Sequence, residues 1–198
     1  MKFSEKLDKI IEKNNSLLCV GLDTNYEKIP GHLKELEYPI FEFNKAIIDA
    51  THDLVCAYKP NSAFYEAFGA QGIEQLKMTY EYINEKYPDV VTILDAKRGD
   101  IGSTNEGYIK FTFEYLNSDS ITLHPYLGRE SLEDFLNYED RGLIFLCRTS
   151  NPGSGEFQDL EVSGEQFYKK VAKVISNYWN TSNNCLLVVG ATYPEELA

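Results

Sequence analysis

Six short apolar segments recur along the chain, and each is followed by a helical pattern or by the start of one. The segments are rich in Val, Ile and Leu, which is typical of strands buried on both faces of a parallel sheet. Parallel strands need a crossover connection, usually a helix, so the alternation predicts a repeated βα architecture. The predicted strands cover residues 17–22, 54–58, 90–94, 120–123, 143–147 and 185–189.

The number of βα units separates an open sheet from a closed barrel. An open doubly wound sheet has about five or six strands, whereas a (β/α)8 barrel needs eight. Residues 192–195 match a capping box that would start another helix, yet the chain stops at Ala198. We therefore predict an α/β fold, a (β/α)8 TIM barrel with about six of its eight βα units in this chain. Residues 1–198 would form this single barrel domain without its last two βα units.

Two more segments match the capping-box pattern, in which a Ser side chain caps the first turn of a helix. Residues 103–106 follow the third predicted strand, and residues 163–166 precede an apolar stripe that includes Phe167 and Val171. We predict that a helix capped by Ser begins at each of these segments.

Composition limits the class of partner that the chain can attract. The 198 residues carry a formal net charge of −12. A chain this acidic has no overall positive field for nucleic acid or anionic lipid, so neither is an expected partner. It also has no N-terminal apolar h-region and no long apolar stretch, so no signal peptide and no membrane span are predicted.

The cysteine pattern indicates a reducing compartment. All four cysteines lie in apolar runs, and no two of them form a Cys-x-x-Cys pair. Such cysteines usually behave as small buried hydrophobic residues rather than as disulfides or metal ligands. We expect a cytoplasmic protein with reduced, buried cysteines and no metal site. The residues are Cys19, Cys56, Cys147 and Cys185.

Charged and polar side chains recur where the predicted strands end. Barrel enzymes build their active sites at the carboxyl ends of the strands, so this recurrence predicts a polar site there. Asp95 and Lys97 are two residues apart after the third strand, a spacing that puts both side chains on one face of an extended chain. A carboxylate and an ammonium group held together can tune each other's pKa. Taken alone, this cluster could also be an accidental ion pair in a solvated loop. The groups at strand ends are Asp23, Lys59, Asp95, Lys97, His124 and residues 148–150.

Residues 95–101, which read DAKRGDI, resemble the DxKxxDI signature of the orotidine 5′-phosphate decarboxylase family in its bacterial form. The DxKxxD core is shared with related phosphosugar enzymes. Five other motifs, two before this one and three after it, occur in the order found in this one family. The resemblance runs from about residue 17 to the last residue. The other motifs are VGLD at 20–23, YKPN at 58–61, HPYLG at 124–128, RTSNPG at 148–153 and VGATYP at 189–194.

The resemblance implies a carboxy-lyase that removes CO2 from orotidine 5′-monophosphate to give UMP. This is the last step of de novo pyrimidine nucleotide synthesis, and the family uses no metal and no organic cofactor. Lys97 would stabilise the carbanion at C6 of the pyrimidine and then protonate it. Asp95 would sit against the substrate carboxylate, and Lys59 would bridge Asp95 and the sugar hydroxyls.

The same resemblance implies a homodimer that shares its active sites. Asp100 and Thr104 would reach the site of the other subunit. Asp23 would accept hydrogen bonds from the sugar, Ser150 would read the pyrimidine edge, and residues 151–158 would fold over the base. The family binds the phosphate with a Gln and an Arg from its seventh and eighth strands, beyond the last residue of this chain. We therefore expect the 198 residues alone to be nearly inactive.

Three other interpretations remain open. A sister decarboxylase or synthase acting on a keto-sugar phosphate would need Mg²⁺ and acidic ligands, and the TSNPG segment at 149–153 argues against it. A Schiff-base aldolase would use Lys59 or Lys97 as its nucleophile, but flanking carboxylates would keep Lys97 charged. A non-catalytic, truncated barrel would act only as a dimerising partner.

Three charged residues at the strand ends are not assigned to the reaction. Arg98 alternates with Lys97 along the chain, which favours a structural ion pair. His124 precedes Pro125 without a partner in sequence, which favours a packing or hydrogen-bonding role. The sequence leaves the role of Arg148 open.

Overall fold

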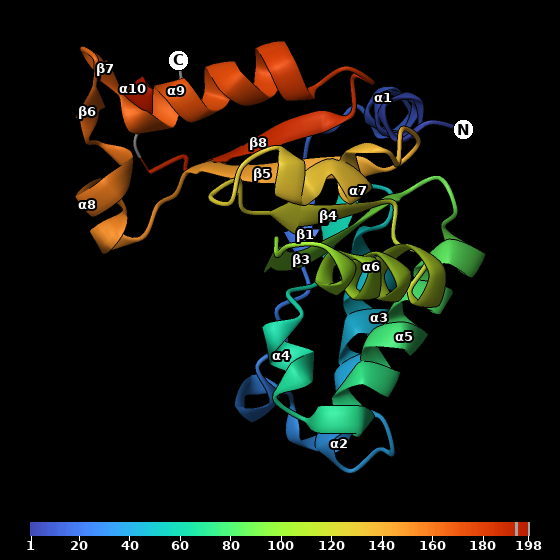
Figure 1. Cartoon of the computed structure of the whole chain (residues 1–198). Helices are drawn as coiled ribbons and strands as arrows, with labels where there is room; N and C mark the ends of the chain where they lie inside the picture. The colour runs from blue at the N-terminus through green and yellow to red at the C-terminus, as the bar shows by residue number, and fades with distance from the viewer. Residues whose placement is uncertain (193, 198) are drawn as a thin grey trace.

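The computed structural model of the protein describes residues 1–192 and 194–197. Its centre is a six-stranded sheet in which all neighbouring strands are parallel and the spatial order follows the chain. Figure 1 shows that the sheet curls and that helices cover its outer face. Among the described strands the first and the last are unpaired edges, so the sheet forms an open half-barrel. The strands are β1 (Cys19–Gly21), β2 (Ala57–Lys59), β3 (Val91–Arg98), β4 (Ser120–Leu123), β5 (Gly142–Arg148) and β8 (Cys185–Val189).

Helices connect the successive strands, which confirms the predicted βα repeat. Two π-helical turns, Lys110–Tyr115 and Ile175–Trp179, extend α6 and α9. Within the described residues, no helix combines the length and the apolar character needed to cross a membrane. The helices are α1 (Phe3–Asn14), α2 (Gly31–Lys34), α3 (Pro39–Thr51), α4 (Ala63–Glu66), α5 (Gly69–Lys86), α6 (Ser103–Ile109), α7 (Glu133–Leu136), α8 (Gly155–Gln158), α9 (Phe167–Val174) and α10 (Pro194–Leu197).

Two clusters of buried apolar side chains hold the sheet against the helices. The larger joins β3, β4 and β5 to the outer helices, and the smaller joins α1 and α3 to β2 and the start of β3. Both form because the strands present apolar side chains on both faces, so each face must be covered. The larger cluster includes Leu94, Ile121, Phe145 and Trp179, and the smaller includes Phe3, Ile10, Tyr58 and Val91.

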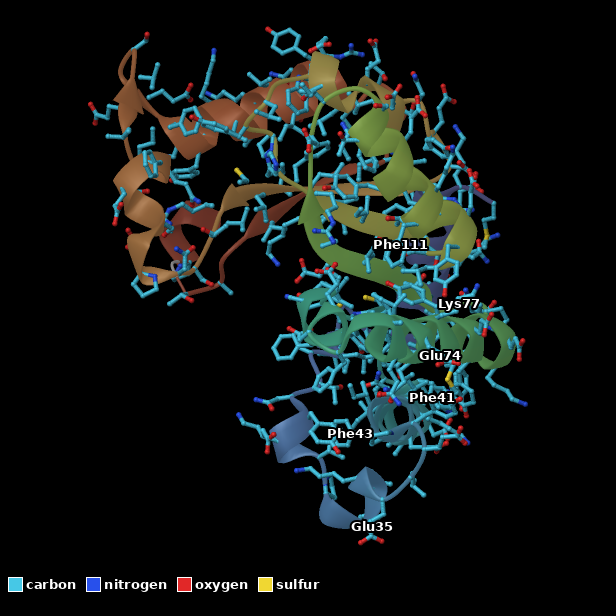
Figure 2. All side chains as sticks on the ribbon, turned by 60° about the horizontal axis from the view of Figure 1, so that its bottom comes forward. Glu35, Phe41, Phe43, Glu74, Lys77 and Phe111 are labelled. Carbon is cyan, nitrogen blue, oxygen red and sulfur yellow. The ribbon has the colours of Figure 1, made fainter. Side chains whose placement is uncertain are left out.

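The outer helices lie side by side along the sheet. Figure 2 shows this layer in side-chain detail, with Phe41 on α3, Glu74 and Lys77 on α5, and Phe111 on the turn after α6. The Lys77 ammonium group donates a hydrogen bond to the carbonyl oxygen of Tyr115, so it ties α5 to the end of the next helix. This order of helices follows the order of the strands that they connect.

The strand β1 is less buried than the sequence predicts. Its flanking residues Leu17 and Leu18 are 80% and 50% exposed, and the thiol-bearing Cys19 is exposed as well. The prediction that all four cysteines are buried is therefore wrong for Cys19 and holds only in part for Cys185, which is half-buried, whereas Cys56 and Cys147 are buried. The physical reason is position: β1 pairs only with β2 among the described strands, so one edge and part of one face have no neighbour.

Two of the predicted capping boxes are wrong. Helix α6 begins at Ser103, but its N-cap is Gly102 at φ 51° and no side chain caps it. Ser163 and Gly164 instead form the two-residue turn between β6 (Glu161–Val162) and β7 (Glu165–Gln166). Their φ values of 56° and 80° are those of a primed hairpin turn, which matches the twist of the two strands. The third box, at 192–195, includes residue 193, which lies outside the described residues.

The first residue of β5 is a site of close packing that a substitution can test. A Cβ atom on Gly142 would lie 2.7 Å from the Phe3 ring, so Gly142→Ala would push α1 away from the sheet. We expect a loss of about 1–3 kcal/mol in the free energy of unfolding, measured by urea denaturation. Gly107→Ala is the matched control, because Gly107 is an exposed helical residue with nothing within 4 Å of the added Cβ. The free energy of unfolding of Gly107→Ala should rise by up to about 1 kcal/mol. Equal effects of the two substitutions would contradict the inference that Gly142 is required by its close contact with Phe3.

Candidate active site

The candidate site begins with an irregular extension of β3. The sequence predicts that the strand ends at Leu94, but the structure continues it to Arg98, with a shift of register against β4 between these two residues. Lys97 lies within the shift at φ 49°, a left-handed conformation that is rare outside glycine. Such bulges re-aim side chains at the ends of strands. Here the bulge sends Lys97 back toward Asp95.

Thr122 on β4 stabilises this bulge from the neighbouring strand. Its hydroxyl oxygen accepts a hydrogen bond of 2.9 Å from the backbone N–H of Lys97. The same hydroxyl donates a hydrogen bond of 2.8 Å to the carboxylate Oδ1 of Asp95. Thr122 therefore fixes both the backbone of the one residue and the side chain of the other. Thr122 was not among the predicted site residues, and the available signal was a hydroxyl in an apolar strand, one residue before its end.

The Asp95 carboxylate lies between two ammonium groups. Lys97 Nζ donates to Oδ1 over 2.7 Å, and Lys59 Nζ donates to Oδ2 over 2.9 Å. The Asp95 side chain is 9% exposed, whereas Lys59 is 32% and Lys97 is 48% exposed. Asn61 adds a longer contact, 3.4 Å from its amide nitrogen to Oδ2. The structure thus brings Asp95 and Lys97 together, and it places Lys59 of the adjacent strand against Asp95, the contact that the resemblance implies.

Burial and charge act in opposite directions on these groups. Burial raises the pKa of Asp95, but hydrogen bonds from Lys97, Lys59 and Thr122 outweigh it, so the pKa is held below its usual range. For Lys59, burial lowers the pKa, while the contact with Asp95 and the charge of Asp23 outweigh that effect and raise it. At neutral pH the site therefore contains a carboxylate and a lysine that both stay charged.

Asp23 stands at the end of β1, close enough to influence the charge of Lys59. It lines an open cavity of 520 Å³ whose other walls include Val20, Lys28 and Phe43. Asp95 is not among the lining residues, so this cavity is beside the charged cluster rather than over it. The charge of Asp23 therefore acts on Lys59 from the side of this cavity.

The remaining predicted site residues make contacts of their own. The Asp100 carboxylate accepts a hydrogen bond of 2.8 Å from the N–H of Ile101, and its backbone N–H donates to Asn105. Thr104 is exposed on the first turn of α6, and Ser150 is exposed just after β5. Of the predicted site residues in the described part of the chain, the hydrogen bonds and ion pairs join Lys59, Asp95 and Lys97 into one group.

Three further polar residues near the site, two arginines and a histidine, have structural contacts. Arg98 pairs with Glu66 and lies 5.0 Å over the Tyr108 ring, which confirms its predicted structural role. His124 packs against Gly99, where an added Cβ would lie 3.1 Å from the His124 Nε2 atom. Arg148 is 4% exposed and pairs with Asp159. None of these three bonds to the Asp95 carboxylate, whose hydrogen bonds in the described chain come from Lys59, Asn61, Lys97 and Thr122.

Comparison with known proteins gives a consistent result. The sequence profile described as "Orotidine 5'-phosphate decarboxylase / HUMPS family" matches residues 16–197. The curated orotidine 5'-phosphate decarboxylase of Cellvibrio japonicus is 52% identical over 200 residues, covering 100% of this chain and 72% of the relative. That of Flavobacterium johnsoniae is 53% identical over 195 residues, covering 98% of this chain and 71% of the relative.

A solved structure supports the barrel assignment. The OMP decarboxylase of Leishmania donovani superposes with a TM-score of 0.89 at 37% sequence identity, covering 100% of this chain and 74% of that one. With the six parallel strands described above, this similarity confirms the prediction of a partial (β/α)8 barrel.

The lowered pKa of Asp95 predicts how the free energy of unfolding depends on pH. A group whose pKa is lower in the folded state contributes fully above its unfolded value, near pH 4, and loses this contribution as the pH falls through its folded value. Asp95→Asn should lower the free energy of unfolding at pH 7 by about 1–3 kcal/mol. It should also flatten the decline between pH 5 and the acid range, measured by urea denaturation at several pH values.

Asp89→Asn is the control for this experiment. The Lys13–Asp89 pair has the same 2.7 Å length as the Lys97–Asp95 contact, but its side chains are more than 60% exposed. Solvent screens such a pair, so its removal should change stability by less than about 1 kcal/mol. If the free energy of unfolding changes with pH in parallel for wild type and Asp95→Asn, the ionisation of Asp95 does not contribute to the pH dependence of stability, and the prediction is wrong.

Proposed function

The chain belongs to the Orotidine 5'-phosphate decarboxylase / HUMPS family, and on this premise we propose that it converts orotidine 5'-monophosphate into UMP and CO2. The enzyme would be a carboxy-lyase acting at the last step of de novo pyrimidine nucleotide synthesis. The observation that carries the proposal is the Lys59–Asp95–Lys97 group at the carboxyl edge of the sheet. It joins a fixed carboxylate to a lysine that is half exposed and free to meet a ligand.

In the proposed reaction, Lys97 acts as electrostatic catalyst and as general acid. The bond between C6 and the substrate carboxyl carbon breaks, CO2 leaves, and the electron pair stays on C6. An ammonium group held nearby stabilises this negative charge because it is already oriented. Lys97 then gives its proton to C6 and is reprotonated from solvent. The 2.7 Å contact with Asp95 supports the role, since it fixes the position of Nζ.

Asp95 would act on the substrate before the bond breaks. Its low pKa keeps it ionised at neutral pH, so it would face the substrate carboxylate with a like charge. Repulsion of that kind raises the energy of the bound substrate and is relieved as neutral CO2 departs. Lys59, bound to the other carboxylate oxygen, would hold Asp95 in place and contact the sugar hydroxyls.

The other predicted residues would bind the nucleotide. We propose that Asp23 accepts hydrogen bonds from the sugar, supported by its place on the cavity beside Lys59. Ser150 would contact the edge of the pyrimidine, and the segment after it would cover the base. Contacts remote from C6 let binding energy assist the chemical step rather than only tighten binding.

We further propose a homodimer in which Asp100 and Thr104 serve the partner's site. Both residues lie at the carboxyl edge of the sheet, in the loop after β3 and the first turn of α6. Exposed apolar side chains at the same edge of the sheet support this proposal, because Ile101, which follows Asp100, is 63% exposed and Tyr126, in the loop after β4, is 85% exposed. Exposed apolar groups that gather around a polar site are typical of an interface.

Lys97→Ala tests the proposed chemistry. Loss of the general acid and of the fixed ammonium should lower kcat by at least about 10²- to 10⁴-fold. The measurement is CO2 release from carboxyl-labelled orotidine 5'-monophosphate. Lys13→Ala, which changes an exposed lysine far from the site, is the control and should keep wild-type activity.

The assay should use two forms of the protein. One is the 198-residue chain, and the other is extended by the C-terminal segment of the Cellvibrio japonicus relative, of which this chain covers 72%. We expect the extended form to turn over faster, because the family resemblance implies that the phosphate-binding Gln and Arg would lie in that segment. Absence of turnover by both forms, or full turnover by Lys97→Ala, would contradict the proposed function.

A mixing experiment tests the shared site. Lys97→Ala and Asp100→Ala should each be inactive alone, since each damages every site of its own dimer. A mixed dimer would contain one intact site, built from Lys97 of one subunit and Asp100 of the other. Random exchange of equal amounts should therefore restore roughly a quarter of the wild-type activity. No recovery, despite exchange of subunits shown by mass spectrometry, would place Asp100 in its own subunit's site.

A further inference from the structure

The segment after β5 is held together by a residue whose role the sequence leaves open. Figure 1 shows the chain leaving β5 and extending to one side, through α8 and the β6–β7 hairpin, before α9 returns along the sheet. We call residues 149–159 the β5 loop. It contains a short 3-10 turn at Pro152–Ser154 and α8, and it follows directly on Arg148.

The Arg148 guanidinium contacts the start, the middle and the end of the β5 loop. Nη1 donates to the carbonyl oxygen of Thr149 over 2.9 Å and to the hydroxyl of Ser154. Nη2 donates to Asp159 Oδ2 over 3.0 Å, and Nε lies 3.0 Å from Asp159 Oδ1. Arg148 is 4% exposed, so these contacts replace the water that the charge would otherwise bind.

A second set of hydrogen bonds closes the neck of the loop. The backbone N–H of Thr149 donates to the side-chain oxygen of Gln158 over 2.8 Å. The amide nitrogen of Gln158 in turn donates to the Thr149 hydroxyl over 2.9 Å. The two ends of the β5 loop are therefore joined to each other as well as to Arg148. A loop closed at its neck and packed by its own side chains moves as one unit, as in compact Ω-loops.

Ser150 is fixed by the same arrangement. It lies one residue from the Arg148 contacts and packs against Gly190 at the end of β8, where an added Cβ would lie 2.8 Å from the Ser150 Cβ. The Gly190 N–H also donates to the Arg148 carbonyl oxygen over 2.7 Å. Ser150 thus lies within the fastened β5 loop and packs against the end of β8.

We propose that Arg148 is a positioning residue, whose buried guanidinium holds the β5 loop as a single folded unit and so places Ser150 for contact with the nucleotide base. The part that concerns the base rests on the proposed function, whereas the fastening of the loop does not. Arginine suits this task because its planar fork offers five donors in fixed directions, which lysine cannot match. Arg148 itself touches no reacting atom in this scheme.

Hydrogen exchange of the backbone tests the fastening. In Arg148→Met, amides of the β5 loop should exchange at least about tenfold faster than in wild type, because several bonds to a charged group are lost. Arg148→Lys should fall between the two, since one ammonium group restores only part of the contacts. Amides of β3 and β4 should not change. Arg129→Met is the control, because Arg129 forms an exposed pair with Glu133 at 3.4 Å and should leave the β5 loop unaffected.

Asp159→Asn keeps the test decisive if Arg148→Met does not fold. Asp159 is 40% exposed, so this variant keeps the buried arginine and loses only the paired charge. It should also speed exchange in the β5 loop. Wild-type exchange rates in a folded Arg148→Met protein and in Asp159→Asn would overturn the proposal.

UMP binding tests the link to Ser150. Calorimetric titration of the C-terminally extended form with UMP should show at least about tenfold weaker binding for Arg148→Met, a smaller loss for Arg148→Lys, and none for Arg129→Met. Faster exchange in the loop with unchanged UMP affinity would overturn the positioning role. If the extended wild-type protein does not bind UMP, the proposed function fails, while the exchange rates still decide whether Arg148 fastens the loop.

Discussion

The candidate site depends on one buried carboxylate held between two ammonium groups. Burying the Asp95 carboxylate costs free energy, and the contacts from Lys59 and Lys97 offset that cost. The carboxylate therefore stays ionised although it is buried. The pair of lysines would repel each other without the carboxylate between them. Asp95 therefore orders both lysines, and its charge is what makes the half-exposed Lys97 a fixed cation rather than a mobile surface side chain.

Three neighbouring strands must be in register for this to happen. β2 ends at Lys59, β3 runs past Asp95 with a bulge, and β4 supplies Thr122. Because the strands are parallel, their carboxyl ends meet at one edge, and residues far apart in the chain come together there. A bridge between Asn61 and Asp95 extends the contact of β2 and β3 beyond the regular ladder. The rest of the fold, with its apolar clusters on both faces, keeps these three strand ends at fixed positions.

Much of this could be predicted from sequence. Apolar strands alternating with helical patterns gave the parallel sheet, and the predicted second strand, 54–58, ends one residue before β2 ends at Lys59. Asp95 and Lys97 are in contact, as their spacing suggested, but the contact is made through a left-handed bulge at Lys97 rather than along a regular extended chain. Local patterns failed where another local structure used the same residue types. Ser163 and Gly164 match a capping box, yet they form a hairpin turn, because a Ser-Gly pair also suits the left-handed conformations of that turn.

By itself, then, the sequence determined the fold class, the family and the edge of the sheet where the charged groups gather. These follow from periodicity and from short motifs, which are local properties of the chain. Only the tertiary structure decided which side chains meet and which stay exposed. Thr122 bonds to the bulge at Lys97, Arg148 bonds to the β5 loop, and Cys19 is exposed on an edge strand. Those facts depend on which strand lies beside which and on how closely backbones approach, and no local pattern contains that information.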